Sequence, residues 1–169
     1  RVLRDLLELA RARVQASVGY GTVDAARIFW VNPVADLRIM NLLEQCGARI
    51  CGTEYLFSHA LDPIPEDLPP LEALACSALA DPMIGSAQDR AERIAQDMQA
   101  FGAEGLVISR IPGASHCGLE GRIIAQTIRE RLQIPTLEIE IPPITDSLRP
   151  ALQTRLEALV ETIKERRAS

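Results

Sequence analysis

The sequence predicts an α/β protein with a doubly wound, mostly parallel, four-stranded flavodoxin-like sheet that carries helices on both faces. One observation is a set of short apolar runs rich in β-branched and aromatic residues, at 27–31, 48–52, 105–109 and 134–139. The other is that segments with a helical spacing of apolar residues separate these runs. Strands joined through helices need crossover connections, which make the strands parallel and cover both faces of the sheet.

The segments between the strands carry the helical period. Apolar residues at i, i+3, i+4 and i+7 run from Ile39 to Cys46, and Gly47 follows as a residue suited to end a helix. Ser86 is the predicted N-cap of a later helix. The other helices are expected at residues 3–14, 71–79, 91–101, 119–132 and 148–163.

The composition is that of one folded domain. The chain has 169 residues, of which 47% are hydrophobic and 24% charged, and we expect a lead-in helix and linker over residues 1–26 and an α/β domain over residues 27–169. No apolar run approaches the roughly 20 residues that span a bilayer, so no membrane partner is expected. The net charge of −5 argues against a nucleic-acid partner, because such domains carry a clustered basic face. The N-terminal residues lack a secretory pattern, which predicts a cytoplasmic protein whose cysteines are reduced thiols or metal-cluster ligands rather than disulfides.

Ligands of doubly wound sheets bind beyond the carboxyl ends of the strands, where the strand order reverses. In this chain the rule directs attention to the connections 32–35, 53–70 and 110–121. Glu54 and Glu120 flank the predicted crevice, and we expect both carboxylates to be hydrated surface charges. No residue is assigned as a catalytic acid, base or nucleophile.

Cys117 is the strongest candidate for a functional residue. It follows the third strand at the start of a helix, where backbone N–H groups and the helix dipole stabilise a thiolate. His116 beside it could donate a hydrogen bond or a proton, and Gly118 allows a ligand to approach the backbone closely. A buried, inert thiol is the alternative, since free cysteine is among the most buried residue types. The spacing from Cys117 to Arg122 is one residue short of the C-x5-R loop of small tyrosine phosphatases.

Neither the other cysteines nor a nucleotide-binding motif indicates a second site. Cys46, Cys51 and Cys76 fall on predicted helices or strands, and we expect them to fill core space. No G-x-G-x-x-G and no G-x-x-x-x-G-K-[ST] motif follows a strand, which argues against classical nucleotide binding.

Several stretches, taken in order, resemble the C-terminal domain of the 2-hydroxyacyl-CoA dehydratase and benzoyl-CoA reductase family, whose members are iron–sulfur subunits. The similarity extends from about Arg27 to Glu161. The stretches are RIFWVNPVADLRIMNLLEQCGARICGTE, PPLEALACSALADPMIGSAQDRAERI, AEGLVISRIPGASHCGLEGR, IPTLEIE and LRPALQTRLEALVE. The family places an aromatic residue before the cysteine and an acidic one after it, whereas this chain has His116 and Gly118 there.

The resemblance implies that Cys117 is one ligand of a [4Fe-4S] cluster. In this family an open iron binds the thioester carbonyl of an acyl-CoA substrate and delivers single low-potential electrons, for radical dehydration or ring reduction. An ATP-hydrolysing iron–sulfur activator or a ferredoxin would supply those electrons in an anaerobic cytoplasm.

One thiolate cannot hold a four-iron cluster. The resemblance therefore implies that a homologous second subunit, or upstream domains missing from this chain, completes the cluster and that the isolated chain is inactive. The first residue is Arg1 rather than methionine, so we expect a fragment or a processed product. The alternative is a non-catalytic flavodoxin-like binding or assembly domain in which Cys117 is a structural thiol.

Overall fold

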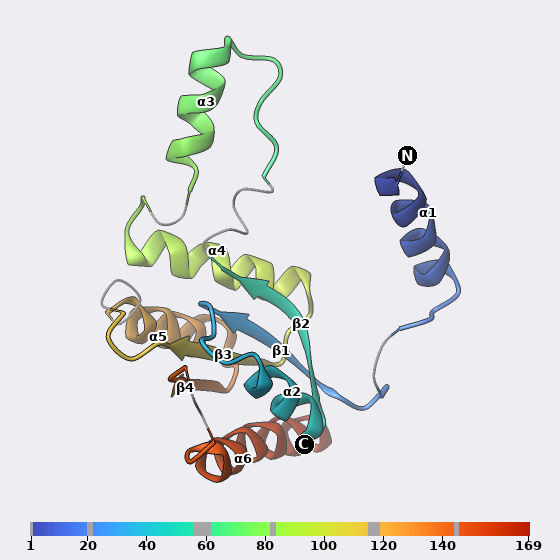
Figure 1. Ribbon diagram of the computed structural model, residues 1–169, viewed down its shortest axis with the longest axis vertical. Coiled ribbons are helices and arrows are strands. Elements are labelled where there is room, and N and C mark those ends of the chain that lie inside the picture. The colour runs from blue at the N-terminus through green and yellow to red at the C-terminus, as the bar shows by residue number, and fades with distance from the viewer. Residues whose placement is uncertain (1, 20–21, 56–61, 82–83, 115–118, 144–145) are drawn as a thin grey trace.

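A computed structural model describes the whole chain except residues 1, 20–21, 56–61, 82–83, 115–118 and 144–145. Four parallel strands form one sheet in the order β2-β1-β3-β4 (Figure 1). They are β1 (Ala26–Val31), β2 (Ala48–Glu54), β3 (Gly105–Arg110) and β4 (Thr136–Glu140). The predicted doubly wound fold is confirmed, and each strand lies within about two residues of its predicted bounds.

Two helical layers cover the sheet (Figure 1). The helices α2 (Arg38–Gln45) and α6 (Arg149–Ala168) lie on one face, and α4 (Ala87–Ala100) and α5 (Glu120–Leu132) lie on the other. Alternate strand residues divide accordingly: Trp30 joins the core with α2 and α6, whereas Phe29 and Val31 join the core with α4 and α5. Both faces of the strands are therefore buried, which explains their nearly continuous apolar runs.

Local interactions determine the start of α4 and the close packing of α6 on the sheet. Ser86 caps α4 as predicted: its hydroxyl accepts a hydrogen bond from the Asp89 N–H, and the Asp89 carboxylate accepts one from the Ser86 N–H. At Gly105 of β3, a Cβ atom would lie 2.6 Å from Cδ1 of Ile163 and 2.8 Å from Cδ1 of Ile28. Glycine at this position lets α6 pack directly against the sheet.

Helices α1 (Val2–Gln15) and α3 (Pro70–Leu79) lie apart from the sheet (Figure 1). No residue of α1 is buried, and α3 buries only Ala73. Cys76 on α3 is exposed, so the prediction that it fills core space is wrong. The apolar spacing of α3 predicted the helix but not a buried side for it, because periodicity does not say what an apolar face packs against. Within the described ranges, no helix has the length and apolar character needed to cross a bilayer.

Candidate functional site

The carboxyl ends of β1 and β3 form the point at which the strand order reverses. The chain passes from β1 to β2 on one side and then returns to place β3 on the other side of β1. The connections that leave β1 and β3 therefore diverge there, which is the standard geometry of a ligand crevice in this class of sheet. The connection over residues 111–119 leaves β3 at this edge and leads into α5.

A buried hydrogen-bonded group joins the ends of β1 and β3. Asn32, with a positive φ of 69°, donates from Nδ2 to the carbonyl oxygen of Ser109 at 3.1 Å. The Trp30 indole N–H donates to the Ser109 hydroxyl at 2.9 Å, and that hydroxyl lies 3.0 Å from the Asn32 carbonyl oxygen. All three residues are buried. Asparagine is one of the few residues other than glycine that tolerate this backbone conformation, so it can turn the chain here and bridge two strands.

Arg90 on α4 lies beside this group and is almost fully buried, with 2% of its side chain exposed. Its Nε and Nη2 donate to the two carboxylate oxygens of Glu54 at 3.0 and 2.7 Å, which is a bidentate pair. Nη2 also donates to Oδ1 of Asn32 at 2.7 Å, and Nη1 donates to Glu120 at 2.5 Å. One guanidinium thus links the end of β2, the end of β1 and the first residue of α5.

The charges in this cluster stabilise the ionised form of Arg90. Burial acts against the charged guanidinium and is the largest single influence on its pKa, but the hydrogen bonds and charges of Glu54 and Glu120 outweigh it and raise the pKa. The prediction that Glu54 is a hydrated surface charge is therefore wrong, because its side chain is only 4% exposed and bonded to Arg90. Glu120 is half-buried and bonded to the same guanidinium. Sequence reasoning missed Arg90, although it lies four and eight residues before Ile94 and Met98 on the buried stripe of α4.

The predicted ligand Cys117 and its neighbours His116 and Gly118 lie outside the described residues. The chain on either side is described. After β3, the Ala114 N–H donates to the Ile111 carbonyl oxygen in a turn, and α5 begins at Glu120 behind Leu119. The role of Cys117 therefore stays a prediction.

The three described cysteines do not assemble into a metal site. Cys46 packs against the core with α2 and α6, and Cys51 on β2 packs against the opposite core, as predicted. Burial raises the pKa of both thiols above the ordinary value of 9.0. Among the residues that the structure places, no three histidine, cysteine or acidic side chains come close enough to hold a metal ion. These thiols thus do not fit a four-iron cluster.

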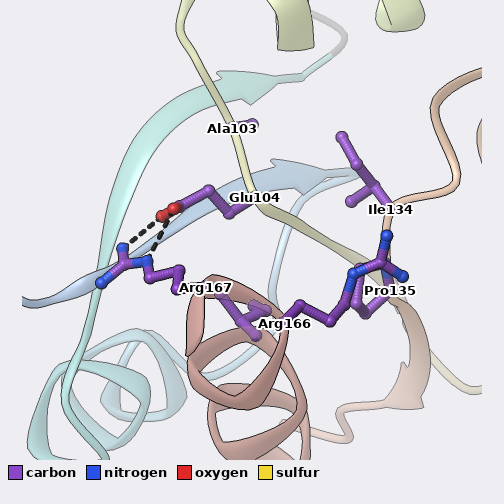
Figure 2. Close-up of a pocket in the computed structure, with 7 residues that line it drawn as sticks. Ala103, Glu104, Ile134, Pro135, Arg166 and Arg167 are labelled. Atoms are coloured by element: carbon purple, nitrogen blue, oxygen red, sulfur yellow. Dashed lines mark hydrogen bonds and ion pairs between the residues drawn. The ribbon is translucent and has the colours of Figure 1, made fainter. Parts of the chain in front are cut away.

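A pocket of about 240 Å³ lies at the opposite, amino-terminal edge of the sheet (Figure 2). Glu104 and Arg167 meet beside it: the guanidinium donates to both carboxylate oxygens, at 2.7 and 2.5 Å. Arg167 also donates to the backbone carbonyl oxygens of Asp24 and Ala25, and Glu104 accepts from the Arg27 N–H. The ion pair between Glu104 and Arg167 connects the end of α6 with the start of β1. We therefore assign a structural role to the amino-terminal edge of the sheet.

Replacing Arg167 with glutamine is expected to lower the free energy of unfolding at pH 7 by about 1 kcal/mol, the upper range for a partly exposed pair. The hydrogen bond from Arg167 is the main reason that the pKa of Glu104 lies below its ordinary 4.5. A depressed carboxyl pKa stabilises the fold above pH 4.5, and this contribution is lost as the pH falls through the folded-state pKa. Urea denaturation of both proteins from pH 7 to pH 3 should show the difference shrinking in acid. Arg166→Gln is the control, and a pH-independent difference would contradict this assignment.

Comparison with known proteins adds one match. A family model described as 2-hydroxyglutaryl-CoA dehydratase, D-component, matches residues 1–163. No curated protein matches the chain.

Proposed function

Because the chain belongs to the family of the 2-hydroxyglutaryl-CoA dehydratase D-component, we propose that it supplies Cys117 as one ligand of a [4Fe-4S] cluster in a 2-hydroxyacyl-CoA dehydratase. The observation that carries the proposal is the place of the 111–119 connection, which leaves β3 at the reversal of strand order. Sheets of this class bind ligands beyond the strand ends at such a reversal, and this supports the choice of Cys117, which follows β3 in the sequence.

The start of α5 supports a thiolate in that connection. The residue before the helix, Leu119, makes no capping hydrogen bond through its side chain. Glu120, the first residue of α5, directs its carboxylate to Arg90. Neither described side chain caps the first-turn N–H groups, and the positive end of the helix dipole favours an anion there. Such a helix start favours a thiolate over a thiol, which supports Cys117 as the ligand.

A four-iron cluster needs more cysteine ligands than Cys117 alone supplies. The described thiols do not converge, so the other cluster ligands would come from a homologous second subunit or from upstream domains. When bound, such a cluster supplies an open iron for the thioester carbonyl and single low-potential electrons. We propose an acyl-CoA substrate, an ATP-dependent iron–sulfur activator or a ferredoxin as electron donor, and an anaerobic cytoplasm. The matched family favours dehydration over the ring reduction of benzoyl-CoA reductases.

The experiment is anaerobic iron reconstitution of the full assembly, followed by iron analysis and electron paramagnetic resonance of the reduced protein. Cys117→Ser is expected to lose most of the cluster signal, because serine is a poor replacement for a thiolate ligand. Cys76→Ser is the matched control, since Cys76 is exposed on α3 and should leave the signal intact.

An unchanged signal in Cys117→Ser would contradict the proposal. Slow alkylation of Cys117 by iodoacetamide at neutral pH in the native apoprotein would favour the alternative of a structural thiol, because a thiolate at a helix start reacts rapidly.

A further inference from the structure

Both ends of the 111–119 connection are attached to one continuous hydrogen-bonded network. At the β3 end, the Ser109 carbonyl oxygen accepts from Nδ2 of Asn32. At the α5 end, the Glu120 carboxylate accepts from Nη1 of Arg90. The Asn32 amide closes the network, because its Oδ1 accepts from Nη2 of the same guanidinium. Asn32 and Arg90 therefore connect the point where the segment leaves the sheet with the point where it enters the helix.

Neutralising a buried charge does not account for the second carboxylate in this cluster. The bidentate pair with Glu54 already balances the charge of Arg90. Glu120 is a second carboxylate partner of the same guanidinium. The Glu120 side chain is 27% exposed and could be hydrated, and a carboxylate in a first helical turn is also favourable beside its own N–H groups. The bond to Arg90 instead joins the first residue of α5 to α4.

We propose that Arg90 is a positioning residue, which through Glu120 and Asn32 holds the first turn of α5 in a fixed relation to the carboxyl ends of β1 and β3. The inference rests on the proposed function in one respect, namely that the connection so held carries the ligand Cys117. In this proposal the network acts on the two described ends of the connection, and Arg90 takes no part in the reaction itself.

The test compares two ion pairs that join the same two helices. Glu120→Ala removes the link from α4 to the first turn of α5. Glu92→Ala removes the link between Glu92 on α4 and Arg131 in the last turn of α5. Both variants exchange a partly exposed glutamate for alanine, so they change charge and side-chain volume equally. They differ in which end of α5 they release.

Two measurements on the full chain distinguish release of the first turn of α5 from release of its last turn. Hydrogen exchange is measured at the amides of residues 124–127, which bond to carbonyl oxygens of the first turn of α5. Iodoacetamide alkylation of Cys117 is measured in a Cys76→Ser background, because Cys76 is exposed. Glu120→Ala is expected to speed exchange there about fivefold, the factor that corresponds to a modest ion pair, and to change the alkylation rate. Glu92→Ala should change neither, and Glu120→Gln, which keeps an acceptor, should fall between.

Asn32→Gly provides a second, independent variant. Glycine accepts the positive φ of 69° without strain, so the substitution removes the amide link and leaves the turn. We expect faster exchange both at residues 124–127 and at the end of β3, residues 108–110. Exchange and alkylation in Glu120→Ala that match those of Glu92→Ala would overturn the proposal, as would an effect of Asn32→Gly confined to β3.

The two proposals fail in different ways. Positioning is read from exchange and alkylation of the iron-free chain, whereas the ligand role is read from the cluster signal of Cys117→Ser. A changed exchange rate in Glu120→Ala together with an intact cluster in Cys117→Ser would retain the positioning network and reject the iron ligand. The reverse pair of results would retain the ligand and reject Arg90 as its positioning residue.

Discussion

Replacing Arg90 with alanine is expected to lower the free energy of unfolding by about 3–5 kcal/mol, the range for removing one partner of a buried ion pair. The substitution leaves the Glu54 carboxylate, only 4% exposed, without its bidentate partner. It also removes the donor to Oδ1 of Asn32. The loss of a bidentate ion pair and an unsatisfied amide oxygen are both unfavourable where the side chains are buried. Equilibrium denaturation in urea, followed by circular dichroism, measures the change.

Arg93→Ala is the matched control on the same helix. Arg93 lies about one turn further along α4 and pairs with Asp62, but its side chain is 37% exposed, so the loss should be at most about 1 kcal/mol. The double variant Arg90→Met/Glu54→Leu removes both charges and should recover much of the lost stability. A change for Arg90→Ala no larger than that for Arg93→Ala would contradict the assignment of Arg90 as the centre of a buried network.

Trp30→Ala is expected to lower the free energy of unfolding by a similar amount, about 3–5 kcal/mol, as for other large-to-small changes of a buried aromatic residue. The Trp30 side chain has no exposed surface and packs in the core between the sheet, α2 and α6. Its removal leaves a cavity and takes the indole donor away from the Ser109 hydroxyl. Thermal and urea unfolding both report the loss.

Trp30→Phe separates the contribution of the buried ring from that of the indole hydrogen bond. Phenylalanine keeps most of the buried ring but lacks the indole N–H, so the expected loss is smaller than that of Trp30→Ala. Val23→Ala, at a side chain that is 94% exposed, is the control for a surface change and should alter the stability little. A loss below about 1 kcal/mol for Trp30→Ala would show that this side chain does not organise the core.

The strands and helices followed from local patterns because their physical causes are local. The stripe from Ile39 to Cys46 predicted α2, whose buried residues are Ile39, Leu42 and Leu43. Ser86 predicted the start of α4, because a capping hydroxyl acts on N–H groups only two or three residues away. Strand ends shifted by one or two residues: β4 begins at Thr136 rather than at residue 134, since pairing with β3 decides where a strand starts.

The Arg90 cluster did not follow from local patterns. Glu54 and Asn32 lie 36 and 58 residues from Arg90 in sequence, and Glu120 lies 30 residues away on the other side. Composition predicts hydration for an isolated glutamate at the end of a strand, because most such residues face water. One local signal was available, namely a positive charge on the otherwise apolar face of α4, since a buried arginine requires a carboxylate partner.

By itself the sequence determined the fold class and the order of the strands and helices along the chain. These depend on periodicity and on the parallel crossover rule, both of which act over short stretches of chain. Only the tertiary structure decided that Arg90, Glu54, Asn32 and Glu120 meet. Side chains from β2, α4, α5 and the residue after β1 converge only after the strands have paired and α4 has packed on the sheet, because hydrogen bonds between them require separations near 3 Å.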